Sequence, residues 1–275
     1  MIRFFILLTG LCFSLYASTI ENKIIKFEND RFSKNTRIEV QTISVVMKKS
    51  LPVKGWYGFI VEIEALMAGK NVKAKDIVFS DGKIVSSELF DLDTSKSYKD
   101  LMNPTLSSKY YDKSKLIAGT HNAKDKIVVF SDPLCPFCID FLPDVINYVK
   151  KHPKKIALYY YNFPLVRHHP AALPLSKLSI LAKNKGIKDI ELKVYTRDWD
   201  KYFTSKEKDE EKIIKAFNSE FMTNFTKKDI DKKSINDEIV HDMDMGEDVM
   251  VQGTPTVFIN GEIDKTRIKY ESLGK

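Results

Sequence analysis

Residues 127–138 read IVVFSDPLCPFC, a short apolar run followed by two closely spaced cysteines. The uninterrupted apolar run predicts a strand that is buried on both faces. A turn is expected over residues 132–134, directly before Cys135. Because proline is favoured in the first turn of a helix, Pro136 indicates that a helix begins beside this cysteine.

The flanking sequence completes a larger unit. Apolar side chains four residues apart, at Phe141, Val145 and Val149, predict a helix over residues 136–151. The apolar residues 156–161 predict the next strand. Strand, dithiol, helix and strand in this order form a β–α–β unit with a Cys-x-x-Cys motif at the start of its helix.

The spacing of Cys135 and Cys138 suits thiol–disulfide exchange, which needs one attacking thiolate and one resolving thiol. Unpaired N–H groups and the positive end of the helix dipole are expected to lower the pKa of Cys135. Cys138 lies inside the helix and is expected to be more buried and less acidic. A disulfide between such near neighbours would stabilise the fold little, which favours redox turnover over a structural role.

Two plainer roles for the cysteines remain open. A single Cys-x-x-Cys pair supplies half of a tetrahedral zinc site, and His168 and His169, adjacent on one segment, would chelate one ion poorly. An inert structural disulfide would explain neither the strand before it nor the helix after it. We predict no metal site and no cofactor beyond the redox-active disulfide Cys135–Cys138.

The rest of the chain indicates two further parts. Residues 18–94 predict a small α+β unit, with a helix over 20–34, alternating apolar residues over 57–64 and a hairpin turn at Asp81-Gly82. A polar segment over residues 95–123 predicts a helical linker.

Residues 168–249 are expected to be mainly helical, because apolar side chains recur at helical spacing. Residues 253–256 read GTPT and precede an apolar strand, Val257-Phe258-Ile259, which a turn at Asn260-Gly261 joins to a partner strand. A proline before a strand is common and by itself indicates little.

The first residues indicate export. A basic start, a short apolar centre and a small residue at Ala17 are typical of a signal peptide over residues 1–17. The apolar run is short for a membrane anchor, and bulky Leu11 before Cys12 argues against a lipoprotein. Removal of residues 1–17 would leave Cys135 and Cys138 alone in a compartment where disulfides persist.

The net charge of +7 does not indicate nucleic-acid binding. Lysines alternate with acidic residues along the whole chain, and no compact basic stripe with interleaved aromatic residues is present. We therefore expect no nucleic-acid partner.

Residues 129–138 resemble the bacterial Dsb thiol–disulfide oxidoreductases, above all the DsbC/DsbG group, which places Phe, Asp and Cys-x-x-Cys in the same way. Thr254 before Pro255 fits that group better than the valine usual in DsbA, and so does the long segment before the dithiol. Residues 163–172 and the long helical block resemble DsbA instead. Phe137 differs from both, since DsbA has histidine there and DsbC and DsbG have tyrosine.

This resemblance implies a fold. We expect a thioredoxin-like α/β catalytic domain over residues 124–275 with a helical insertion over 168–249. A small α+β, cystatin-like dimerisation domain over residues 18–94 would precede it, followed by the linker over 95–123.

The resemblance also implies roles for residues outside the dithiol. The bond between Thr254 and Pro255 is expected to be cis and to lie beside the dithiol, where residue 254 can pair with an extended substrate strand. Thr254 and Pro255 are thus candidate substrate-binding residues, and Pro136 and Phe137 are candidate modulators of the catalytic pair Cys135 and Cys138.

The function implied is that of a periplasmic enzyme that forms or isomerises disulfides in exported proteins. Its partners would be exported proteins with cysteines, a membrane redox partner and a second copy of the chain. We predict a reduction potential between about −120 and about −230 mV, so that the protein can both form and reshuffle disulfides. Two other classes stay open: a dimeric holdase with an incidental dithiol, and a heme or metal delivery protein.

A few more residues are weaker candidates. His168 and His169 are candidates to tune Cys135 or contact substrate, and Asp132 is a candidate proton acceptor. The plainer interpretations are a solvated helix start for the histidines and a turn residue for Asp132. The methionines at 243, 245 and 250 are expected to pack in the core rather than to line a substrate surface.

Overall fold

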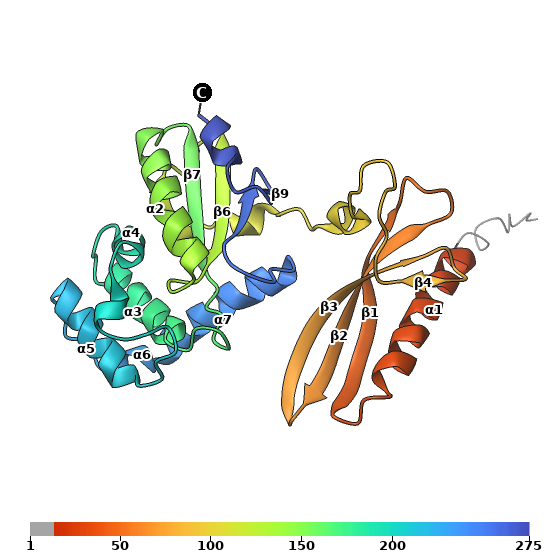
Figure 1. The fold of residues 1–275 in the computed structure, drawn as a ribbon, viewed down its shortest axis with the longest axis horizontal. Helices are drawn as coiled ribbons and strands as arrows, with labels where there is room; N and C mark the ends of the chain where they lie inside the picture. The colour runs from red at the N-terminus through yellow and green to blue at the C-terminus, as the bar shows by residue number, and fades with distance from the viewer. Residues whose placement is uncertain (1–13, 275) are drawn as a thin grey trace, which may run out of the picture. The chain divides into compact units, whose positions relative to one another are not determined.

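The computed structural model describes residues 14–274, and the chain divides into two compact units between Asn103 and Pro104. Figure 1 colours the first unit from red to yellow and the second from yellow to blue. The signal peptide predicted over residues 1–17 falls mostly outside the described range. Within that range, no helix combines the length and the apolar character that crossing a membrane requires.

The first unit is an antiparallel sheet with a helix along one face (Figure 1). Its four strands lie in the order β1-β2-β3-β4, so each strand pairs with its neighbour in the chain. The elements are α1 (Ser14–Phe32), β1 (Ile38–Ser50), β2 (Tyr57–Met67), β3 (Lys70–Ser80) and β4 (Val85–Ser86).

The predicted alternation over residues 57–64 is confirmed in β2. Phe59, Val61 and Ile63 are buried on one face, where they pack in the same core as Ile24 of α1. Side chains of successive strand residues point to opposite faces, so this alternation gives the helix an apolar surface on which to pack.

Two other predictions for this unit are confirmed, and one strand is new. The helix expected over residues 20–34 is α1, which begins earlier, at Ser14. The turn at Asp81-Gly82 joins β3 to β4, and the φ of +88° at Gly82 is one that glycine adopts without steric cost. Strand β1 was not predicted, although it is longer than β2.

The second unit is built on a five-stranded sheet in the order β5-β7-β6-β8-β9. Strands β6 and β7 are parallel and α2 connects them, which confirms the predicted β–α–β unit. Strand β8 runs antiparallel to β6 on its other side. The elements are β5 (Leu116–Gly119), β6 (Asp125–Ser131), α2 (Pro136–Lys151), β7 (Ile156–Asn162), β8 (Thr256–Ile259) and β9 (Glu262–Ile263).

Both faces of this sheet are buried, as the apolar run in β6 predicted. Val129 packs on the side of α2 together with Val145, whereas Phe130 packs on the opposite side together with Met245 of α7. Alternate residues of one strand thus supply two cores.

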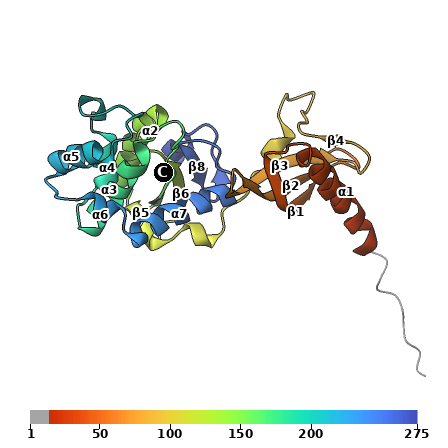
Figure 2. The same cartoon turned by 90° about the horizontal axis from the view of Figure 1, so that it is seen from below.

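A block of helices lies between β7 and β8, as predicted. Figures 1 and 2 show α3, α4, α5 and α6 gathered on one side of the second unit. The helices are α3 (Ala172–Asn184), α4 (Ile190–Tyr195), α5 (Glu210–Phe221), α6 (Lys227–Ile230) and α7 (Lys233–Asp248).

The helical linker expected over residues 95–123 is divided between the two units. Residues Tyr98–Met102 form a short 3-10 helix, and Met102 is buried against Gly58 of β2, where a larger residue would collide with it. The later part holds β5, which pairs with β7. The second unit therefore begins at Pro104, upstream of the predicted boundary at Lys124. The physical reason is that Met102 is buried in the first unit, whereas β5 pairs with the sheet of the second.

Candidate functional site

The strand register brings the two sequence motifs together. Phe130 of β6 pairs with Thr256 of β8, so residues 254 and 255 run beside the turn that follows β6. The peptide bond between Thr254 and Pro255 is cis, as predicted. The Cys135 thiol donates a hydrogen bond to the Thr254 carbonyl oxygen, with 3.3 Å between Sγ and O. Segments 119 residues apart in the sequence thus form one site.

The dithiol begins helix α2. Cys135 is the N-cap of this helix with an extended backbone, and Pro136 is the first helical residue. Both cysteines are free thiols and both are buried, Cys135 with 4% and Cys138 with 0% exposure. The expectation that Cys138 is the more buried of the two is confirmed.

The two thiols differ sharply in acidity. A hydrogen bond from the Cys138 side chain lowers the pKa of Cys135 to about 5. The Thr254 side chain and the backbone N–H groups of Phe137 and Cys138 act in the same direction, while burial opposes them. The predicted direction is confirmed, but the neighbouring thiol contributes more than the helix N–H groups.

Burial has the opposite result at the second cysteine. It raises the pKa of Cys138 far above the ordinary value of a thiol, and the adjacent Cys135 adds to the rise. A hydrogen bond with Ser131 lowers it again in part. At neutral pH the site therefore holds one thiolate and one thiol, the pair that exchange chemistry requires.

Phe137, like Pro136, is an exposed residue of the motif. Its side chain is 66% exposed, and the Arg267 guanidinium lies over its ring, 6.0 Å from the ring centre. An aromatic face next to Cys135 offers apolar surface to an incoming protein segment. Phe137 brings no charge of its own to Cys135.

Asp132 anchors the turn before the dithiol. One carboxylate oxygen accepts from the Leu134 N–H at 2.7 Å, and the other accepts from the Leu165 N–H at 2.7 Å. His169 Nδ1 lies 3.0 Å from the second oxygen. The sequence did not indicate this clamp, which ties the segment after β7 to the segment that carries Cys135.

His168 and the methionines were the other candidates for contacts with Cys135 or substrate. His168 is exposed, and Met243 and Met245 pack in the hydrophobic core as expected. The expectation is wrong for Met250, which is only partly buried and belongs to none of the hydrophobic cores of the described residues. Among residues 14–274, no three His, Cys, Asp or Glu side chains are grouped as a metal site would require.

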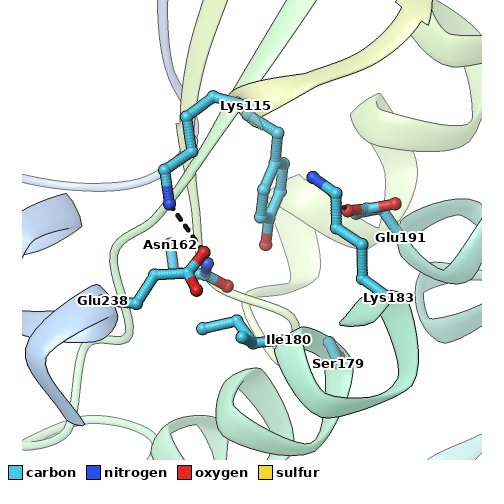
Figure 3. A pocket seen from close by; sticks show the side chains of 8 residues that line it. Lys115, Asn162, Ser179, Ile180, Lys183, Glu191 and Glu238 are labelled. Atoms are coloured by element: carbon cyan, nitrogen blue, oxygen red, sulfur yellow. Dashed lines mark hydrogen bonds and ion pairs between the residues drawn. The ribbon is translucent and has the colours of Figure 1, made fainter. Parts of the chain in front are cut away.

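A second buried polar cluster holds the end of β7. Asp242 of α7 accepts from the backbone N–H of Asn162 at 3.0 Å and from its side-chain amide at 2.9 Å. Lys115 Nζ lies 2.6 Å from the same carboxylate and 2.9 Å from Glu238. Burial lowers the pKa of Lys115, but the two carboxylates outweigh it and the net shift is upward. Figure 3 shows Lys115 and Glu238 facing each other across a cavity.

A family model described as Thioredoxin matches residues 112–275, more than half of the chain. A curated relative, the probable disulfide bond formation protein D of Bacillus anthracis, is 27% identical over 164 residues, which cover 53% of this chain and 69% of that protein. Its counterpart from Bacillus cereus is 25% identical over 157 residues, with the same two coverages of 53% and 69%.

Solved structures with a similar fold include BdbD from Bacillus subtilis, with 19% identity and a TM-score of 0.49. That match covers 62% of this chain and 91% of the other. A periplasmic thioredoxin-like protein from Salmonella enterica serovar Typhimurium has 16% identity and a TM-score of 0.47, with coverages of 61% and 92%.

Proposed function

The chain belongs to the thioredoxin family, and on that premise we propose that this thiol–disulfide oxidoreductase forms and rearranges disulfide bonds in exported proteins. The observation that carries the proposal is the pair of unequal thiols. Cys135 has a pKa of about 5 at the start of α2, and Cys138 stays protonated beside it.

The reaction follows from this pair. In the oxidising direction, a substrate thiolate attacks Cys135 Sγ in the Cys135–Cys138 disulfide, and Cys138 leaves. A second substrate thiol then attacks the substrate sulfur of the mixed disulfide, and Cys135 leaves as a stable thiolate. In the reshuffling direction, the Cys135 thiolate attacks a wrong disulfide, and another substrate thiol then attacks the substrate sulfur of the mixed disulfide, so that Cys135 leaves again as a thiolate. If Cys138 attacks Cys135 instead, the substrate leaves reduced and the Cys135–Cys138 disulfide forms. Thr254 and Pro255 are the proposed substrate contacts, and Pro136 and Phe137 the proposed modulators.

We propose that the protein catalyses both disulfide formation and disulfide reshuffling. The name of the Bacillus relatives and the low pKa of Cys135 support disulfide formation. The separate first unit and Thr254 support reshuffling of the DsbC/DsbG kind. We place the protein in the periplasm and propose a second copy and a membrane redox partner as its associates.

The decisive experiment uses two substrates. Reduced ribonuclease should refold in the presence of the oxidised protein, and scrambled ribonuclease should regain activity with the reduced protein. Cys135→Ser should abolish both activities, whereas Cys138→Ser should accumulate mixed disulfides because resolution is lost.

A further variant separates catalysis from chaperone activity. If the wild-type protein is inactive in both ribonuclease assays, while replacement of both cysteines leaves suppression of aggregation intact, the protein is a holdase and the proposal is wrong.

A further inference from the structure

A row of buried hydroxyl groups leads away from Cys138. Ser131, at the end of β6, is buried like Cys138 and lowers the pKa of that thiol. The Tyr195 hydroxyl donates to Ser131 Oγ at 2.7 Å, and the Tyr160 hydroxyl lies 3.0 Å from that of Tyr195. All four residues are buried, although they come from four different elements. Each hydroxyl can donate one hydrogen bond and accept others, so the row is continuous.

The row ends at a small cavity. Tyr160 lines it together with Asn162, Ser179, Ile180 and four charged residues, Lys115, Lys183, Glu191 and Glu238. The cavity has a volume of about 20 Å³, which is room for roughly one water molecule.

Figure 3 shows charged side chains on both sides of this cavity. The side chains of Lys183 and Glu238 are each 35% exposed, so the cavity lies at the protein surface. The hydroxyl row therefore joins the most buried sulfur of the site to a place that water reaches.

We propose that Ser131, Tyr195 and Tyr160 form a proton relay between Cys138 and this cavity. The inference rests on the proposed function, because it concerns the step in which Cys138 resolves a mixed disulfide. Ser131 contacts the reacting sulfur, while the two tyrosines act through it as positioning residues.

Cys138 Sγ attacks Cys135 Sγ, the Cys135–substrate bond breaks, and the substrate sulfur leaves with the bonding electron pair. The hydroxyl groups first rotate from the arrangement in which Tyr195 donates to Ser131 Oγ, so that each donates toward the cavity. The Cys138 proton then passes to Ser131 Oγ, the Ser131 proton to Tyr195, the Tyr195 proton to Tyr160, and the Tyr160 proton to water in the cavity. The departing substrate thiolate takes up a proton from solvent. When Cys138 leaves a disulfide in the oxidising direction, the same protons move in reverse.

Burial makes such a path necessary. Cys138 has no exposed surface, and burial raises its pKa, so direct removal of its proton by solvent is unfavourable. Asp132 is a buried carboxylate in the turn before the dithiol, but it already accepts from two backbone N–H groups and faces His169. The relay gives the proton another exit.

Other charged groups act on the relay from the elements packed around it. Burial raises the pKa of Tyr160 well above its ordinary value, and the charges of Glu191 in α4, Cys138 and Asp132 add to the rise. Burial and the neighbouring Tyr160 raise the pKa of Tyr195 in the same way. Both tyrosines thus keep their protons over the working pH range and can pass them on only in concert.

The test separates the two cysteine steps in one measurement. Reduced protein is mixed in a stopped-flow instrument with dithiobis(nitrobenzoate), an aromatic disulfide that releases a coloured thiolate at each step. The first release reports attack by Cys135, and the second reports resolution by Cys138. In Tyr160→Phe and Tyr195→Phe, the second phase should slow by about tenfold or more, while the first phase is unchanged.

Two readouts distinguish a relay from a structural role. The second phase of the variants should rise more steeply with pH, because hydroxide must now remove the Cys138 proton. Its solvent deuterium isotope effect should fall, because fewer protons move together.

Tyr161→Phe is the matched control. This neighbouring tyrosine of β7 is equally buried, but its hydroxyl donates to the Tyr110 carbonyl oxygen instead. The relay is wrong if both test variants resolve as fast as Tyr161→Phe. A slow first phase in the wild-type protein would instead contradict the low pKa of Cys135 and with it the proposed function. Far-ultraviolet circular dichroism of each variant checks the fold.

Discussion

Single residues in this site turn two identical thiols into unequal partners. Interactions with Cys138, with Thr254 and with the first N–H groups of α2 lower the pKa of Cys135 and so favour its thiolate. Cys138 sits one helical turn deeper, where burial favours the neutral thiol. The two thiols therefore differ in acidity because of their surroundings: the adjacent thiol favours the Cys135 thiolate most, and burial favours the Cys138 thiol.

The first prediction concerns the reactivity of Cys135. The rate of its alkylation by iodoacetamide should follow a titration with a midpoint near pH 5, because the pKa of Cys135 is about 5. Mass spectrometry should find the label on Cys135 and not on Cys138. A midpoint at or above about 8.5, the value of a free thiol, would contradict the hydrogen-bonded thiolate.

The second prediction concerns stability and pH. The folded pKa of Cys135 lies below its unfolded value of about 8.5, so its contribution is present above that value and is lost as pH falls through about 5. The pKa of Cys138 is raised, so its contribution is present below about 8.5 and is lost as pH rises further.

The free energy of unfolding of the reduced protein, relative to the oxidised protein, should therefore rise by about 4 kcal/mol from about pH 5 to about pH 8.5. Above that range it should decline. Denaturant unfolding of both redox forms across this range measures the difference. Parallel curves for the two forms would show that neither thiol pKa is shifted by folding.

Packing between whole elements determines how the dithiol is held. The carboxylate of Asp132 ties the turn after β6 to the segment after β7, and Asp242 of α7 ties the end of β7 to Lys115. These are buried contacts between parts that are distant in the sequence. They keep β6, β7 and α2 in register around Cys135.

The third prediction tests the cluster around Asp242. Lys115→Ala should lower the free energy of unfolding by about 3–5 kcal/mol, because it leaves the buried Asp242 carboxylate without its cation. Lys109→Ala is the matched control, since its pair with Asp248 is about half exposed and should contribute less than about 1 kcal/mol. Chemical denaturation of both variants measures the contrast, and equal losses would mean that burial of the Lys115 pair has no energetic effect.

The whole molecule consists of two units, and the chemistry described here lies in the second. In the first unit, β1 is an edge strand whose outer side has no partner among the described residues. A long edge strand presents free N–H and C=O groups that another strand can pair with. This edge is the physical basis for proposing that the first unit dimerises.

The fourth prediction follows from that edge. The full mature chain should be a dimer by light scattering, and the compact unit Pro104–Lys275 alone should be a monomer. Both should show the same alkylation profile at Cys135, since the contacts that lower its pKa all lie within the second unit. A monomeric mature chain would remove the dimerisation proposal and leave the dithiol chemistry intact.

Local sequence patterns predicted those elements whose side-chain periodicity is unbroken. The helix over residues 136–151 agrees with α2 at both ends. Strand β1 was missed because register shifts after Val40 and after Val45 break its alternation. Strand β5 was missed because it is only four residues long within a polar segment.

The dithiol, the helix that begins beside it and the proline motif could all be predicted from the sequence, because each depends on neighbours within a few residues. The distant groups that surround the sulfurs could be identified only once the fold of the second unit was known. The contacts of Tyr195 with Ser131 and of His169 with Asp132 join positions 64 and 37 residues apart. Such pairs depend on how strands and helices pack, and no local periodicity encodes that packing.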